Sequence, residues 1–95
     1  MAKQIKVWNG RAYCCKNWSD PRWFKNHFGA DCAFVAAYSR EDARRVIEEY
    51  CGKKPSVAEL RDYWSPCWGN PMKGVEPERG LWIQFEHTQK PVRVY

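Results

Sequence analysis

Residues 32–52 read CAFVAAYSREDARRVIEEYCG, and this stretch decides the fold of the chain. Its first seven residues are apolar without alternation, which is typical of a strand buried on both faces of a sheet. Ser39 then begins a helix, because a serine followed three residues later by an acid forms most of a capping box. The apolar residues that follow recur at helical spacing: Ala43, Val46, Ile47, Tyr50 and Cys51. Gly52 stands where a helix commonly ends, so the sequence predicts a buried strand followed directly by an amphipathic helix.

A second helix and two strands are predicted downstream. Ser56 and Glu59 form another capping box, which indicates a short helix over about residues 57–64 that ends before Pro66. Its predicted buried side holds Val57, Leu60, Tyr63 and Trp64. Residues 81–86 alternate strictly, as a half-buried strand does, and the predicted inward side chains are Leu81, Ile83 and Phe85. Residues 91–95 alternate again, and Pro91 marks them as an edge strand.

Upstream, residues 3–16 have the pattern of a β-hairpin around Asn9-Gly10. Asn-Gly is the strongest short hairpin signal, because a type I′ turn needs positive φ at both central residues. The register then gives a core face, consisting of Ile5, Val7, Ala12 and Cys14. The opposite face is aromatic and basic, and it consists of Lys6, Trp8, Arg11 and Tyr13. Residues 21–28 are predicted to form a short helix or an ordered loop after Pro21.

The predicted order of elements is β-β-β-α-α-β-β, which indicates an α+β fold. We expect a single domain over residues 1–95, with a mostly antiparallel sheet and two helices packed on one face. The 95 residues are 44% hydrophobic and 28% charged, which excludes a disordered tail and a coiled coil. No apolar run approaches the ~20 residues of a membrane helix, and the first residues do not resemble a signal peptide. We therefore expect a cytoplasmic protein without a membrane partner.

The five cysteines make a poor disulfide framework, because their number is odd and Cys14 and Cys15 are adjacent. Reduced thiols in a cytoplasm are therefore expected. No pair of ligands has the spacing of a structural zinc site. A set of Cys14, His27 and Cys32 is conceivable, but buried thiols and a surface histidine are the favoured interpretation, so neither a metal nor a cofactor is expected.

No catalytic motif survives inspection of the sequence. Cys67 lies in an aromatic loop, far along the chain from His27 and close to neither an evident base nor an orienting group. The glycines match no nucleotide-binding fingerprint. A small enzyme is therefore the third of three functional hypotheses.

The leading hypothesis is a protein-binding surface. Residues 65–80 form a long loop rich in Gly and Pro, and loops of this length inside a small domain are usually functional. Tryptophan, tyrosine and arginine are enriched at binding hot spots, and they cluster here as candidate partner-binding residues: Arg22, Trp23, Arg61, Tyr63, Trp64 and Trp68. The alternative is that tryptophans such as Trp64 and Trp82 only close the core of a small domain.

The second hypothesis is a single-stranded DNA- or RNA-binding module. The net charge is +5, and residues 1–27 hold six basic residues against Asp20 alone. Cations neutralise phosphates and rings stack on unpaired bases, so the candidate nucleic-acid-binding residues are Lys6, Trp8, Arg11 and Tyr13. The alternative is that another segment covers this face and that its rings belong to the core.

Four segments carry a resemblance to a group of known proteins. They are AAYSREDARR at residues 36–45, YWS at 63–65, WGNP at 68–71 and PERGLW at 77–82. Over residues 33–85 the chain resembles small uncharacterised proteins carried by bacteriophages and prophages. The resemblance implies a phage-encoded, non-catalytic protein in the cytoplasm of a bacterial host. Such proteins commonly occlude a host protein or ribonucleoprotein complex, and they include anti-CRISPR inhibitors and inhibitors of other host defences. The positive net charge differs from that of acidic DNA mimics, so DNA mimicry is not expected.

Overall fold

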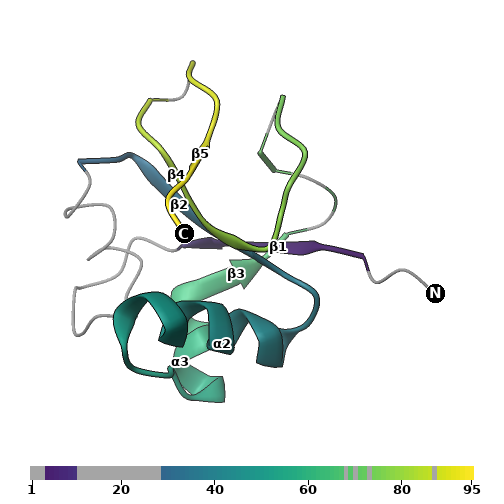
Figure 1. The fold of residues 1–95 in the computed structure, drawn as a ribbon, viewed down its shortest axis with the longest axis vertical. Coiled ribbons are helices and arrows are strands. Elements are labelled where there is room, and N and C mark those ends of the chain that lie inside the picture. The colour runs from purple at the N-terminus through teal and green to yellow at the C-terminus, as the bar shows by residue number, and fades with distance from the viewer. Residues whose placement is uncertain (1–3, 11–28, 68, 70, 73, 87) are drawn as a thin grey trace.

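Five strands form one antiparallel sheet in the order β3-β1-β2-β4-β5 (Figure 1). The computed structural model describes residues 4–10, 29–67, 69, 71, 72, 74–86 and 88–95. In chain order the elements are β1 (Lys6–Gly10), β2 (Cys32–Ala37), α2 (Arg40–Cys51), α3 (Val57–Tyr63), β3 (Trp64–Pro66), β4 (Gly80–Gln84) and β5 (Val92–Arg93). The predicted α+β class and the antiparallel sheet are confirmed.

The strand and helix predicted from residues 32–52 form as expected. β2 lies between β1 and β4, and residues 33–37 are all buried. The Ser39 hydroxyl accepts a hydrogen bond from the Asp42 N–H at 3.1 Å, which caps the first turn of α2. The helix ends at Gly52, whose φ of 82° lies in the left-handed region.

Both helices cover one face of the sheet, below it in Figure 1. The core on this face joins residues from the helices and from four strands: Trp8, Ala33, Val35, Ala37, Ala43, Val46, Ile47, Leu60, Tyr63, Trp64 and Leu81. The predicted capping box of α3 is complete, since Ser56 and Glu59 each accept a hydrogen bond from the other's backbone N–H at 3.0 Å.

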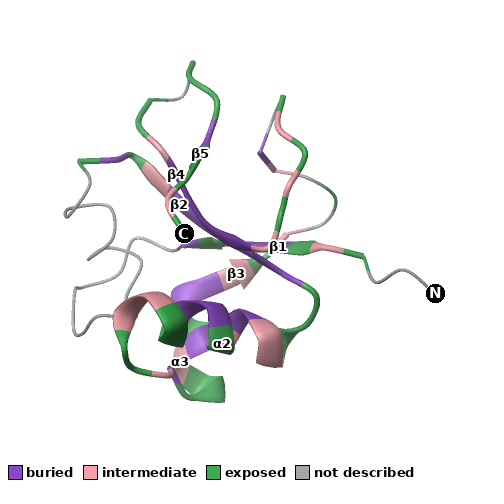
Figure 2. Ribbon diagram, in the orientation of Figure 1, coloured by how far each residue is buried: buried purple, intermediate pink, exposed green. Residues whose placement is uncertain are grey.

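A second core covers the opposite face of the sheet. It consists of Val7, Phe34, Ala36, Met72 and Trp82, with Ile5, Cys32 and Val75 packed against it. Met72 and Val75 belong to residues 67–79, which connect β3 to β4 and are called the β3–β4 loop below. The central strands β2 and β4 are therefore buried on both faces, as their purple colour in Figure 2 shows.

The predicted hairpin around Asn9-Gly10 is wrong. Both residues belong to β1, where Asn9 pairs with Phe34 on one side and with Ser65 on the other. Gly10 pairs with Trp64. The two neighbours of β1 come from distant parts of the chain, and their pairing overrides the local turn signal. The predicted strand over residues 11–14 and the predicted element over residues 21–28 lie outside the described residues.

Two predicted side-chain placements also need correction. Val57 is 48% exposed, because it occupies the outer side of the first turn of α3. Phe85 is 40% exposed, because β4 ends one residue before it. Trp82, which the alternation places opposite the predicted inward side chains, is buried in the second core, in agreement with the alternative that this tryptophan closes the core. The edge strand after Pro91 does form, as β5 at one end of the strand order.

Candidate functional site

A groove of about 780 Å³ lies between the start of β1 and the β3–β4 loop. It is lined by Gln4, Ile5, Lys6, Val7, Trp8, Pro66, Cys67, Gly69, Glu76 and Pro77, and is called the groove below. Its volume lies in the range of clefts that hold a ligand of a few side chains' size.

One wall of the groove is the start of β1, which is left open because β3 is too short to pair with it. β3 pairs with β1 only opposite residues 8–10, and the Cys67 N–H donates a last hydrogen bond to the Val7 carbonyl at 2.9 Å. The chain beyond Cys67 is not part of β3, whereas residues 4–6 continue along the other side of the groove. Ile5 and Val7 both contact the second core, so their side chains share the face that the loop covers.

The opposite wall is held in place at both ends and in the middle. The hydrogen bond at Cys67 fixes its start, and Met72, which is fully buried, fixes its centre. The Val75 N–H closes a turn onto the Met72 carbonyl at 3.3 Å. Near its end, the Trp82 indole N–H donates to the Glu78 carbonyl at 2.9 Å. The loop is therefore a packed wall of the molecule in spite of its length.

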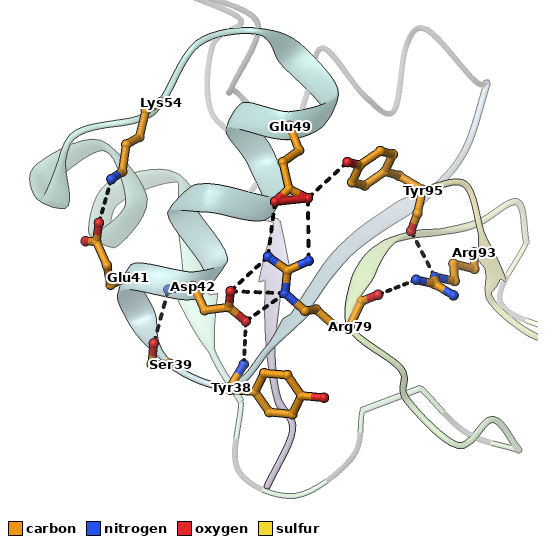
Figure 3. A network of polar contacts seen from close by, with 9 residues as sticks. All are labelled: Tyr38, Ser39, Glu41, Asp42, Glu49, Lys54, Arg79, Arg93 and Tyr95. Carbon is orange, nitrogen blue, oxygen red and sulfur yellow. Dashed lines mark hydrogen bonds and ion pairs between the residues drawn. The ribbon is translucent and has the colours of Figure 1, made fainter. Parts of the chain in front are cut away.

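Arg79 fastens the last residue of the loop to α2 (Figure 3). Its guanidinium donates to Asp42 with Nε–Oδ1 and Nη2–Oδ1 distances of 3.0 and 2.9 Å, and to Glu49 with an Nη2–Oε2 distance of 3.2 Å. The Arg79 hydrogen bonds lower the pKa of both carboxyl groups. Glu49 also accepts a hydrogen bond from the Tyr95 hydroxyl at 2.9 Å, so the chain end joins the same network.

Among the described residues, the ionisable groups that line the groove are Lys6 on β1 and Glu76 and Cys67 on the loop wall. Lys6 and Glu76 are exposed, and neither side chain has a hydrogen bond or ion pair to another described residue. The Cys67 thiol lies 3.6 Å from the Ser65 carbonyl. Burial raises the pKa of the Cys67 thiol, and a hydrogen bond with the Asn9 backbone offsets part of that rise. The thiol is therefore neutral at neutral pH.

Two predicted partner-binding residues belong to the core instead of the surface. Trp64 is 0% exposed and Tyr63 is 8% exposed, because α3 gives way to β3 at this point and both rings pack against the sheet. Arg61 is exposed on α3, 3.4 Å from the Asp62 carboxylate. The remaining predicted residues, Arg22, Trp23 and Trp68, lie outside the described residues.

The predicted aromatic and basic face is also corrected in part. Trp8 is 6% exposed and packs in the core between the sheet and the helices, so its ring is not available to stack on a base. Lys6 is exposed and lines the groove. Arg11 and Tyr13 lie outside the described residues.

The pairing of β1 with β3 brings the two predicted surfaces together. Lys6 comes from the predicted nucleic-acid-binding face, and Cys67 and Gly69 come from the predicted aromatic loop. The residues that sequence reasoning missed are Ile5, Glu76 and Pro77. Loop length indicated the segment that forms one wall of the groove, but only the long-range pairing of β1 with β3 defines which of its residues face β1.

Among the described residues, no group of three or more His, Cys, Asp and Glu side chains is placed to hold a metal ion. Of the conceivable metal set, Cys14 and His27 lie outside this part of the chain. None of the helices in the described part of the chain is long and apolar enough to cross a membrane.

Comparison with known proteins gives no match, whether against protein-family models, curated proteins or solved structures. Inference about function therefore starts from the groove and its lining residues.

Proposed function

We propose that this chain is a non-catalytic binding protein that occludes a host protein or complex by seating part of it in the groove. The resemblance to phage proteins suggests the setting: a phage product in the cytoplasm of a bacterial host, acting as an inhibitor of a host defence such as CRISPR–Cas. The observation that carries the proposal is the anchoring of the groove's loop wall at Cys67, Met72 and Arg79.

Anchoring matters because binding is weakened by the cost of ordering the binding surface. Immobilising a loop at the moment of binding costs conformational entropy, which reduces affinity. In this fold the buried Met72 side chain and the Arg79 hydrogen bonds order the loop during folding. Glu76 and Pro77 are then presented opposite β1 before any partner arrives.

The chemistry of the groove supports binding over catalysis. A nucleophilic thiol needs a lowered pKa or an adjacent base, whereas burial raises the pKa of Cys67. General acid–base catalysis needs a positioned group with a pKa near the working pH. Lys6 and Glu76, the other ionisable groups among the described lining residues, are exposed side chains without a hydrogen bond or ion pair to another described residue.

Nucleic-acid binding is less well supported by the same residues. Binding to single strands combines several cations with exposed rings on which bases stack. Among the described residues, the lining of the groove has one cation, Lys6, and one carboxylate, Glu76, which repels phosphate. The ring of Trp8 is buried in the core.

An affinity pull-down from bacterial lysate, with and without nuclease, tests the proposal. We expect a protein to be retained after nuclease treatment and to be lost when the bait carries Glu76→Lys. Glu86→Lys is the matched control, since Glu86 is also an exposed glutamate, lies outside the groove lining and undergoes the same charge change. Retention of nucleic acid alone, or equal loss with both variants, would contradict the proposal.

A further inference from the structure

We infer that the groove recognises a peptide segment of its partner in which an apolar side chain lies between an acidic and a basic residue. This inference rests on the proposed function and names the chemistry of the partner.

The apolar side chain follows from the groove's lining. Ile5, Val7, Pro66 and Pro77 all line it, and Pro66 is exposed to solvent. Ile5 and Pro77 are half-buried, so they still expose apolar surface that a partner side chain can cover. Removing such surface from water is a favourable contribution to association.

The charges follow from the two walls. Lys6, which alternates with Ile5 and Val7, lines the groove at the open edge of β1, and Glu76 lines it from the loop; neither side chain has an ion pair to another described residue. A partner that places an acid against Lys6 and a base against Glu76 satisfies both charges and is held in one orientation. A partner in the reverse orientation meets like charges on both sides, which costs affinity.

These charges favour a peptide over other occupants of the groove. A nucleic acid brings only negative charge, so it gains at Lys6 and is repelled at Glu76. A purely apolar ligand leaves both charges without a partner. Opposite charges on either side of an apolar group, at the spacing of neighbouring side chains, are an ordinary property of a polypeptide.

Selection from a random dodecapeptide library displayed on particles, with the folded full-length chain as bait, tests the inference. With the wild-type bait, we expect enrichment of peptides that carry an acid and a base on opposite sides of an apolar residue. With Lys6→Glu, the preferred acid should change to a base, and with Glu76→Lys the preferred base should change to an acid. The wild-type consensus peptide should bind each variant about tenfold more weakly, which corresponds to roughly 1.4 kcal/mol.

Two matched variants control for net charge. Lys53→Glu and Glu86→Lys change exposed residues outside the groove lining, and both should retain the wild-type consensus. Thermal melting of all five baits checks folding, which these surface substitutions should leave unchanged.

The library result is distinct from the pull-down result. Three results would overturn the inference. The library could give no enrichment over a blank surface, the consensus could stay unchanged in both Lys6→Glu and Glu76→Lys, or the consensus could carry charges of one sign only. If the pull-down retains a protein that depends on Glu76 while the library gives no such peptide, the proposed function stands and the peptide inference fails. If the pull-down retains no protein, the proposed function itself fails.

Discussion

At Gly80 the backbone of Tyr95 lies too close to leave room for a side chain. The φ of Gly80 is 153°, and a Cβ added there would lie 2.1 Å from the Tyr95 carbonyl oxygen. We expect Gly80→Ala to destabilise the fold by about 3 kcal/mol, because both the backbone and the chain end must move. Gly52→Ala is the control, since a Cβ there meets nothing within 4 Å and costs only the left-handed conformation, about 1 kcal/mol. Urea unfolding measures both values, and equal losses would contradict the close approach.

Arg79 links stability to pH through its two carboxylate partners. Its hydrogen bonds lower the pKa of Asp42 and of Glu49 in the folded chain below their unfolded values. The stabilisation is therefore present above the unfolded pKa values, near pH 4, and is lost as the pH falls through the folded values. We expect Arg79→Gln to cost about 1 kcal/mol at pH 7 and much less at pH 3.

Urea unfolding of the wild type and of Arg79→Gln at the two pH values checks this difference. The pKa of Glu41 is also lowered, chiefly by Lys54, but Glu41 does not touch Arg79 and contributes equally in both proteins. A stability difference that stays constant between pH 7 and pH 3 would show that Arg79 acts through packing alone.

Individual residues show where sequence reasoning reaches its limit. Ser39, Gly52 and Ser56 could be predicted as caps, because each signal depends only on neighbours within a turn. Trp82 was not placed by the alternation of β4, because that pattern does not show that Met72 of the preceding loop folds back over this side of the sheet. An alternating pattern predicts two faces for a strand, but it does not predict that both will be buried.

Among the elements, α2 packs its buried side chains into the core between the sheet and the helices. Ile47 is 0% exposed, so we expect Ile47→Ala to cost about 2–5 kcal/mol through lost burial and a cavity. Val57, on α3, is 48% exposed, and Val57→Ala should change stability by less than about 0.5 kcal/mol. Chemical denaturation of the two variants tests the helix packing. Similar losses of stability for both would contradict the packing of the apolar side chains of α2 against the sheet.

The β3–β4 loop should behave as part of the core. Met72 is fully buried against the sheet, so Met72→Ala should cost about 2–5 kcal/mol, whereas Met72→Leu nearly conserves volume and should cost less than about 1.5 kcal/mol. Amide hydrogen exchange should also become faster at Val75, whose N–H is bonded to the Met72 carbonyl. If Met72→Ala left both stability and exchange unchanged, the loop would not be an anchored wall.

β1 was predicted as a strand, but its end and its pairing partners were predicted wrongly, and this error explains why the groove was not foreseen. Asn9-Gly10 favours a turn only if the strands on either side pair with each other. Here β2 and β3 occupy both sides of β1, and they come from residues 32–37 and 64–66. No local pattern encodes such pairing, so the two candidate surfaces were predicted separately although they form two walls of one groove.

At the scale of the whole molecule, the two faces of the sheet are covered by different kinds of structure. In the described part of the chain, helices α2 and α3 cover one face and contribute five of the eleven buried side chains of the core there, while an anchored loop covers the other face. β3 ends at Pro66 and the loop departs there, which leaves the groove open beside the start of β1. The α+β class and the helices could be predicted from local patterns, whereas the groove is a consequence of topology.

The most direct test of the groove as a binding site is the dissociation constant of the captured partner protein for three baits. These are the wild type, Glu76→Lys and the matched control Glu86→Lys, all measured at the same salt concentration. We predict that Glu76→Lys weakens binding by about tenfold or more, and that Glu86→Lys stays within about twofold of the wild type. Equal dissociation constants for the two variants would contradict a binding site in the groove.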